Sequence, residues 1–495
     1  PATAPDDDIN PATPASPGTP ATPAPAGKSP TATPAPAKPA AVQPMETRNQ
    51  REPDQGPYIT LSSTRDYNLT VRVRLASDNA NMKETFRDPH TGKTVDMPVI
   101  TPFNFQTMGI VWPIIPSTGS SVQQPDTFTG LLRLNGQPWS GSYQVLEGYP
   151  QGVKLARWDA AAEAGKEFVC RQVQLEVTTR ATVGKTTFDE AAAIKVPWPK
   201  GGWPASVETC LAPQLYIETG LDANNQIRAY EDEPLETAIK TWLQSAGVSD
   251  PKRVSPVALA KILTHGVWSA VQINDRTVSG RGAGFGEITS RTGEFGGVNI
   301  QPPFQTLQSG RGSPPDAAAL LTALFRKAGL PARTVIAWDT GSSDSSRVDK
   351  NITGRSRNTN RGLRYLVEFP VFDEAKNTLN WVPIDITKLA KSSSRPQKLE
   401  STWRWFGENS ELNMVIPFSF HFHPPTDVVA YGAPAFWGWF VTPKAPDNAE
   451  QVVTFDGAAA SVRGGQPSTT PAKPGETKKD DRDEKKDERK KKLGY

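Results

Sequence analysis

The sequence has few of the residues that supply nucleophiles, general bases and covalent cross-links. Of 495 residues, two are cysteine and four are histidine. Two cysteines exclude a small scaffold held together by many disulfides. They leave open either one disulfide or two buried thiols, Cys170 and Cys210. The scarcity of histidine limits the candidates for a general base to His90, His265, His421 and His423.

The sequence also lacks a large excess of charge of one sign and a long apolar run. Its 55 Lys and Arg residues nearly balance 52 Asp and Glu residues, for a formal net charge of +3. Nucleic-acid binding is therefore not expected. The longest apolar run, residues 428–441, is interrupted by glycine and proline and is too short to span a bilayer. We therefore expect no transmembrane segment.

Both ends of the chain have the composition of tethers. Residues 1–55 consist mainly of Pro, Ala and Thr and have too little apolar surface to offset chain entropy. Residues 461–495 end in a run of interleaved Lys, Arg, Asp and Glu. We expect both ends to be disordered. The absence of an initiator Met and of an apolar leader suggests a processed chain that is secreted or periplasmic.

The region after the first tether has the period of β-strands. Leu69, Val71 and Val73 alternate with polar residues, as do Val173 and Leu175 farther along. We expect a sandwich-like β domain over residues 56–212, and the two cysteines lie within it. Further short strands over residues 401–460 predict a β extension or a third sheet layer.

A helix is predicted to follow Ser313. Apolar residues from Ala317 to Ala328 recur at intervals of three and four, which lays one buried stripe along about four turns. Ser313 suits the N-cap, Pro314 the first helical position and Asp316 the acid of a capping box. Gly329 is expected just past the end.

This helix resembles the nucleophile helix of the transglutaminase-like superfamily. That family has Gly-x-Cys-x-Asp, a helix and then Gly-Ile/Leu-Pro-Ala-Arg, which here corresponds to Gly312 to Arg333. With Asp316 at the Asp of the motif, the cysteine position falls on Pro314, which carries no nucleophile. Ser313 lies one position away. The N-cap accounts for its presence, and a displaced serine nucleophile is the alternative.

The resemblance also places the remainder of the family's triad. The family's His-x-Trp-Val-Glu corresponds to residues 364–368, so the histidine position is Arg364. Its Trp-x-Pro-x-Asp corresponds to residues 381–385, so Asp385 is similar to the orienting acid. An arginine cannot act as a general base at neutral pH. It can pair with Asp385 instead, and two separately solvated charges are the alternative.

Three other patterns have both functional and structural interpretations. Residues 280–286 are rich in glycine, but no Gly-Lys-Ser/Thr follows, and a loop is expected. His421 and His423 could bind zinc, but the sequence shows no third ligand. In each of two Trp-x-Trp pairs, at 403–405 and 437–439, we expect the two side chains to share one face of a strand. Such a face either joins the core or binds sugars or proline-rich chains.

These patterns predict an α+β protein with five segments. A sandwich-like β domain is followed by a transglutaminase-like domain over residues 213–400 and the β extension, with a tether at each end. Because Pro314 and Arg364 replace the catalytic residues, we expect a pseudoenzyme without cofactor or metal that binds a protein or an envelope polymer. The alternative is a transglutaminase-like or cysteine-peptidase-like hydrolase whose catalytic residues lie at other positions.

Overall fold

The structure is a computed structural model of the chain. It describes residues 54–87, 92, 94–100, 103–214, 217–221, 227–229, 233–273, 286–289, 295–340, 363–393, 395–421, 428–429, 437–443 and 449–459. All of them belong to one unit of the chain, Gln50–Tyr495. The tethers expected at the two ends lie outside the described residues, apart from positions 54 and 55.

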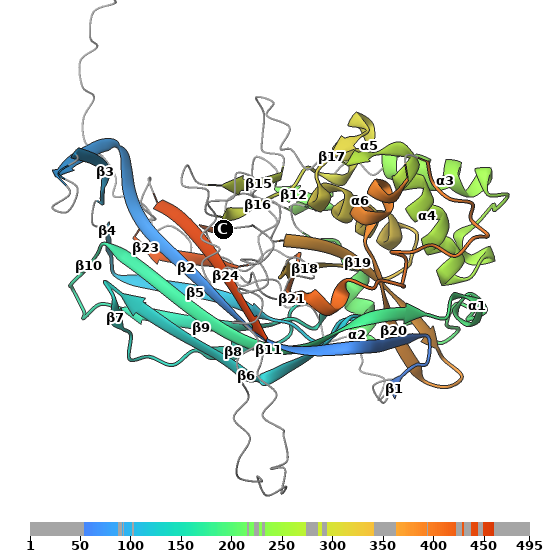
Figure 1. The fold of residues 1–495 in the computed structure, drawn as a ribbon, viewed down its shortest axis with the longest axis horizontal. Coiled ribbons are helices and arrows are strands. Elements are labelled where there is room, and N and C mark those ends of the chain that lie inside the picture. Colours follow the sequence, from blue (N-terminus) through green and yellow to red (C-terminus); the bar gives the residue numbers. More distant parts are fainter. Residues whose placement is uncertain are drawn as a thin grey trace, which may run out of the picture. The chain divides into compact units, whose positions relative to one another are not determined.

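The fold is mixed α+β, as the sequence predicted. Its largest sheet contains eight strands, in the order β15-β16-β24-β2-β11-β6-β7 with β3 paired to β2 (Figure 1). The bounds of these strands are β2 Ile59–Arg87, β3 Thr94–Ile100, β6 Ser121–Leu134, β7 Gln137–Pro138, β11 Gln172–Phe188, β15 Gly286–Thr289, β16 Phe295–Asn299 and β24 Ala449–Ala459.

A second sheet faces the first across an apolar interior. It has five strands, β22 Val428–Val429, β23 Gly438–Thr442, β5 Thr107–Ile114, β9 Lys154–Ala161 and β8 Gln144–Leu146. Trp158 of this sheet packs so closely against Gly130 of β6 that a Cβ atom there would lie 2.2 Å from the indole. The predicted alternation holds, because β2 and β11 pair antiparallel with Val73 opposite Leu175, and both side chains are buried.

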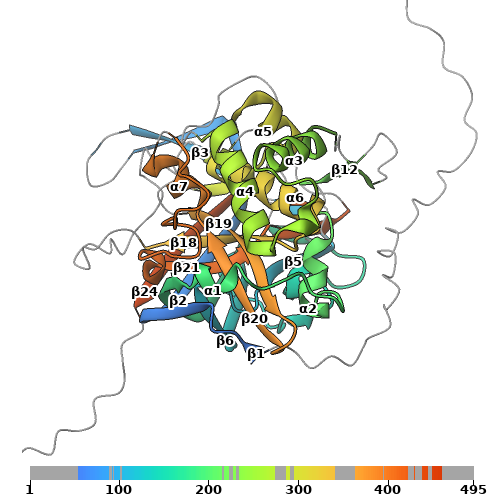
Figure 2. The same cartoon turned by 90° about the vertical axis from the view of Figure 1, so that its right-hand side faces the viewer.

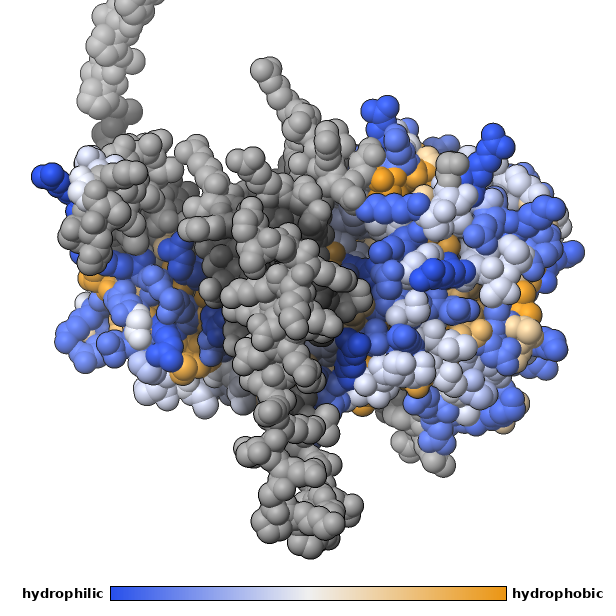
Figure 3. Space-filling view, in the orientation of Figure 1, coloured by the Kyte–Doolittle hydropathy of each residue, from blue (hydrophilic) through white to orange (hydrophobic). Residues whose placement is uncertain are grey.

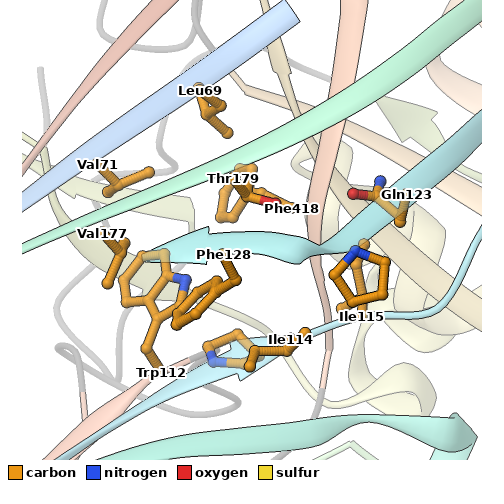
Figure 4. Close-up of a pocket in the computed structure, with 12 residues that line it drawn as sticks. Leu69, Val71, Trp112, Ile114, Ile115, Gln123, Phe128, Val177, Thr179 and Phe418 are labelled. Carbon is orange, nitrogen blue, oxygen red and sulfur yellow. The ribbon is translucent and has the colours of Figure 1, made fainter. Parts of the chain in front are cut away.

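The interior of this sandwich is closely packed. One small cavity, of about 10 Å³, lies among the rings of Trp112, Phe128 and Phe418 and the polar side chain of Gln123 (Figure 4). A volume of this size holds at most a single water molecule. The cavity therefore offers no room for a ligand.

A third sheet carries the residues of the predicted site. Its order is β1-β20-β19-β18-β21. The bounds are β1 Asp54–Gln55, β18 Arg333–Asp339, β19 Leu363–Asp373, β20 Thr378–Ile384 and β21 Val415–Phe420. β18 and β19 are buried along almost their whole length. Helices cover one face, and residues of the sandwich, such as Phe455 stacked at 4.8 Å on Trp338, cover the other.

The helices gather on one face of the third sheet (Figures 1 and 2). They are α3 Glu233–Ser245, α4 Pro256–Ala270, α5 Pro303–Ser309, α6 Pro314–Lys327 and α7 Ile386–Ser392. The minor elements are α1 Glu190–Ala193, α2 Ala205–Glu208, β4 Phe103–Phe105, β10 Phe168–Cys170, β12 Thr219–Leu221, β13 Ile227–Ala229, β14 Gln272–Ile273 and β17 Arg311–Gly312. α6 contacts α3, α4, α5 and α7, so it is the central helix.

The C-terminal strands are shared among the three sheets. β21 pairs with β18, β23 pairs with β5 and β24 pairs with β2. Residues 401–460 therefore join the sheets of the β region and of the transglutaminase-like region, and among the described residues they form no sheet of their own. Such long-range pairing leaves no local signal in the sequence. The domain limits given above stay predictions.

A buried ion pair joins the sandwich to the third sheet. Nη2 of Arg333 lies 2.8 Å from Oε2 of Glu368, and the two side chains are 2% and 0% exposed. Ser117 and Gly119 come from the turn between β5 and β6. The carbonyl of Ser117 accepts from Arg333 at 3.0 Å, and the amide of Gly119 donates to Glu368 at 2.7 Å. A Cβ at Gly119 would lie 2.1 Å from the carbonyl oxygen of Trp381, so only glycine fits there.

Candidate functional site

The N-terminus of α6 is built around a buried carboxylate. Asp316 is 0% exposed and accepts hydrogen bonds from the Ser313 amide at 2.8 Å, the Ser313 hydroxyl at 2.7 Å and the Gln301 amide at 2.8 Å. Burial raises the pKa of this carboxyl, and the three hydrogen bonds oppose that rise. Ser313 is the N-cap of a capping box. Its hydroxyl therefore contacts a carboxylate, and among the described residues it has no hydrogen bond to an imidazole.

Pro314 occupies the first turn of α6, the position where the resemblance places a nucleophile. Its side chain is only partly buried. Its ring lacks an N–H, which costs nothing at a helix start, where the donor would have no partner. Gly329, at φ 80°, ends the helix as predicted. Sequence and structure thus agree on the helix, and the chain has no nucleophilic side chain at position 314.

Arg364 lies near the start of β19, next to a carboxylate from a neighbouring strand end. β19 and β20 pair antiparallel, and Asp385 directly follows β20 as the N-cap of α7, where it accepts from the Lys388 amide at 2.9 Å. Nε of Arg364 lies 3.6 Å from Oδ2 of Asp385. The structure therefore brings the two predicted positions together as an ion pair, at a distance longer than a hydrogen bond.

Two further carboxylates contact the same guanidinium. Asp339, at the end of β18, lies 3.3 Å from Nε of Arg364, and Glu411 lies 2.5 Å from Nη2. Glu411 also pairs with Lys388 at 3.0 Å. The sequence patterns indicated neither acid. Asp339 does end a strand, but nothing local to Glu411 indicates that it folds back onto residue 364.

Opposite charges in this cluster oppose the effect of burial on each group's pKa. Burial lowers the pKa of Arg364, but the charges of the three carboxylates outweigh that effect and raise it overall. Burial raises the pKa of Asp385 in spite of the opposing Arg364 charge. Burial also acts to raise the pKa of Glu411, but hydrogen bonds from Lys388 and Arg364 lower it overall. Arg364 is therefore a permanent cation that holds several acids together and cannot accept a proton.

Two atoms of this cluster are buried without a hydrogen bond. Within the described ranges, neither Nη1 of Arg364 nor Oδ2 of Asp385 has a hydrogen-bond partner. Buried polar groups in native proteins are nearly always paired. Oδ2 of Asp385 nevertheless belongs to the ion pair with Arg364.

Trp405 packs beside the cluster in a strained conformation. Its φ is 76°, which is rare for a bulky residue. Its carbonyl accepts from the Asp385 amide at 2.9 Å. We expected Trp403 and Trp405 to share one face of a strand, and this is wrong. They lie in a turn whose φ values are positive at Trp405 and Gly407, and both indoles are buried.

The remaining candidates do not form a second site within the described part of the chain. Cys170 and Cys210 are separate buried thiols, and burial raises the pKa of each. His421 is buried, and neither ring nitrogen has a hydrogen-bond partner among the described residues. His90, His423 and residues 280–285 lie outside the described residues. Trp437 and Trp439 are both 0% exposed, so they belong to the core.

The described residues contain no group of three or more His, Cys, Asp or Glu side chains able to hold a metal ion. None of the helices in those ranges has the length and apolar character that crossing a membrane requires. The Arg364 cluster and the cap of α6 are therefore the two parts of the candidate site that the geometry supports.

Residues 290–386 match the model of one family, described as the transglutaminase-like superfamily. Among curated proteins, none matches this chain. A candidate cysteine protease of Cytophaga hutchinsonii is 12% identical, with a TM-score of 0.42, over 81% of this chain and 92% of its own. The periplasmic domain of TgpA from Pseudomonas aeruginosa, bound to ethylmercury, is also 12% identical, with a TM-score of 0.24, over 64% and 89% respectively.

Proposed function

Residues 290–386 form a domain of the transglutaminase-like superfamily, and on that premise we propose that this protein is a non-catalytic binding or scaffolding component that acts outside the cytoplasm. The observation that carries the proposal is the environment of Arg364. Where the resemblance places the family's histidine, Arg364 is a cation paired with Asp385, Asp339 and Glu411. A guanidinium in such a cluster holds its proton and cannot take one from a nucleophile.

The residue at the nucleophile position supports the same proposal. Pro314 has neither a thiol nor a hydroxyl, and the hydroxyl of the adjacent Ser313 donates a hydrogen bond to Asp316 at 2.7 Å. A catalytic serine needs a base that can accept its proton repeatedly. Asp316 is 0% exposed and serves as the acid of the capping box. Its geometry is that of a structural cap.

The rival function is that of a transglutaminase-like or cysteine-peptidase-like hydrolase with its residues elsewhere. Such an enzyme needs a thiolate or an activated hydroxyl near an imidazole. Cys170 and Cys210 are 1% and 0% exposed, and burial raises the thiol pKa of both. A reactive cysteine is normally accessible and has a lowered pKa. This favours the binding role over the enzyme.

The cluster itself offers a means of binding. Nη1 of Arg364 and Oδ2 of Asp385 are buried and have no hydrogen-bond partner among the described residues, so a ligand that reached them could form a hydrogen bond with each. The composition of residues 1–55, rich in Pro, Ala and Thr, supports the role of a tether for an exported protein. The partner in this proposal is a protein or an envelope polymer.

The proposal is tested by assaying the purified full-length chain on glutamine-containing peptides, with an amine acceptor and with water. We expect no amide transfer and no hydrolysis, and we expect thiol-specific reagents to leave the folded protein unmodified. The double variant Cys170→Ser/Cys210→Ser is the matched control.

Turnover in the wild type that disappears in the double variant would identify the rival hydrolase. Turnover that survives in the double variant would point to Ser313 or another hydroxyl, and the non-catalytic proposal would be wrong. Cell fractionation of the native host tests the location separately, and recovery only from the cytoplasm would contradict that part of the proposal.

A further inference from the structure

The segment that follows the Arg364 cluster carries a strong local positive charge. Residues 388–404 contain five cations and one acid, Glu400. Their local net charge of +4 exceeds the +3 of the entire chain. We call this the basic segment. Its cations are Lys388, Lys391, Arg395, Lys398 and Arg404.

Most of these cations are directed to solvent. The last four are exposed, and the side chain of Lys388 is 38% exposed. Two buried indoles fix the loop, because Trp268 donates to the Ser393 carbonyl at 3.2 Å and Trp403 donates to the Lys398 carbonyl at 2.9 Å. The segment begins in α7, which packs against α4 and α6 (Figure 2). A fixed backbone presents charge without a large ordering cost.

Trp405 connects this segment to the Arg364 cluster. The guanidinium of Arg404 lies 4.3 Å and the ammonium of Lys388 5.5 Å from its ring centroid. The positive φ of 76° at Trp405 is a conformation that costs free energy for a bulky residue. Strain of this kind persists where the surroundings over-determine it, and it is concentrated at functional sites. Here the strained residue is Trp405, and its ring lies beside the cations of Arg404 and Lys388 and next to Asp385.

We propose that the basic segment, residues 388–404, is a docking surface for an acidic polypeptide segment. The charge complementarity selects an anionic chain. Trp405 is 6% exposed and its ring already faces two cations, so it leaves no aromatic face for a sugar or a nucleic-acid base. Over the helices, the face shown in Figure 3 is largely hydrophilic with small scattered apolar patches.

An acidic polypeptide would be the partner in the binding role proposed above. The biological purpose of the docking surface rests on that role, whereas its affinity for an acidic chain does not. Nearby acids limit the strength with which the basic segment binds an acidic chain. Glu411 pairs with Arg364 and Lys388 at 2.5 and 3.0 Å, whereas Glu400 and Glu408 are exposed and reduce the field. Because four of the five cations are exposed, each contributes modestly and is screened by salt. Binding is therefore weak, rapid and sensitive to ionic strength.

The test is fluorescence anisotropy of a labelled oligo-glutamate peptide with the full chain. The variant is Lys391→Glu/Arg395→Glu/Lys398→Glu, which leaves Lys388, Arg404 and the Arg364 cluster intact. The matched control reverses three exposed cations elsewhere, Arg171→Glu/Lys195→Glu/Lys240→Glu, for the same change in net charge. We expect the variant to lose at least about tenfold in affinity and the control to lose much less.

Salt provides a readout that needs no variant. Affinity of the wild type is expected to fall steeply from about 50 to about 300 mM salt, as the Debye length shortens. Equal losses in variant and control, no loss in the variant, or salt-independent binding would each overturn the proposal. So would preferential binding of an oligo-galacturonate probe, which would make a glycan the partner. Amide turnover alongside intact peptide binding would refute the non-catalytic role and leave the docking surface standing.

Discussion

The buried carboxylate of Glu368 accepts hydrogen bonds from the Arg333 guanidinium at 2.9 Å and from the Gly119 amide at 2.7 Å, which lie 35 and 249 residues away along the chain. Arg333 also lies over the ring of Trp381 at 3.9 Å. Arg333 is the last residue of the signature that suggested the family. In this chain it therefore holds a turn of the sandwich against the third sheet.

The first prediction concerns the buried ion pair of Arg333 and Glu368. Glu368→Gln should cost about 3 to 5 kcal/mol of unfolding free energy, because it leaves the Arg333 charge buried without a counter-charge. Denaturant titration measures the loss. The control is Asp159→Asn, which breaks the exposed pair with Arg157 and should cost less than about 1 kcal/mol. Similar small losses in both variants would mean that the buried ion pair contributes little.

The second prediction concerns the cap of α6. Ser313→Ala should cost about 1 kcal/mol, because the buried Asp316 carboxylate loses the hydroxyl hydrogen bond at 2.7 Å. Ser313→Thr retains a hydroxyl and is the control. Unfolding midpoints measure the effect. Loss of peptide binding in Ser313→Ala at an unchanged melting temperature would show that Ser313 binds a ligand and is more than a cap.

The third prediction concerns Arg364. Arg364→Met should destabilise the fold by about 3 kcal/mol at neutral pH, because Asp385, which is 3% exposed, is left without its counter-charge. Part of the loss should be recovered at acidic pH, where protonation neutralises Asp385. Melting temperatures across pH measure both effects. A loss that is constant with pH would indicate that packing of the side chain matters and its charge does not.

Local chemistry made α6 predictable from the sequence. Its cap, its stripe of apolar residues and its terminal Gly329 all act within a few residues of one another, and the helix begins and ends as expected. The same holds for β2 and β11, whose period is a property of each strand alone. The pairing of Arg364 with Asp385 was predicted because the family motif places these two residues, and their assignment to the family's catalytic positions stays a prediction.

The surroundings of Arg364 could not be predicted in the same way. Glu411 contacts Arg364 from 47 residues farther along the chain, and Trp405 contacts Asp385 from 405 − 385 = 20 residues farther along. No periodicity in the sequence indicates such contacts. The strand predicted from the alternating aromatic residues at 403 and 405 is also wrong, because Trp405 has a positive φ. A bulky residue at positive φ is a tertiary outcome, since local preference alone disfavours it.

The fourth prediction is a dependence of stability on pH that originates at His421. Burial, and then the charge of Arg326, lower the pKa of this imidazole from 6.5 to about 3. Because the folded pKa is depressed, the stabilising contribution is fully present above pH 6.5 and is lost as pH falls toward the folded value. The expected slope is about 1.4 kcal/mol per pH unit within that window.

His421→Phe removes the titration and keeps an aromatic ring of similar size. Between pH 6.5 and about 5, above the range in which most carboxylates titrate, the variant should lose less stability than the wild type. His265→Phe is the control. Burial also lowers the pKa of His265, but this residue is only partly buried, so a smaller change is expected. Parallel stability curves for wild type and His421→Phe would show that the buried imidazole is not the origin of acid sensitivity.

The last prediction returns to position 314. α6 is a helix of 14 residues, and the positive end of its helix dipole lies at the first turn. A thiol introduced by Pro314→Cys should therefore have a pKa at least about one unit below that of an ordinary cysteine, near 8.5. The rate of iodoacetamide labelling against pH measures it, with peptide mapping to separate the buried native thiols. Ser309→Cys, at the last residue of α5, is the control and should show no such fall, because the helix end there is negative.

Adding Arg364→His to Pro314→Cys then tests the register of the family positions. An imidazolium close to the thiolate would stabilise it and lower the thiol pKa further. Such a further fall would mean that residue 364 reaches the thiol, as the family arrangement requires, and that the chain has kept the geometry of an active site while losing its chemistry. An unchanged pKa in both variants would show that the family positions were assigned to the wrong residues and would remove the main support for the non-catalytic proposal.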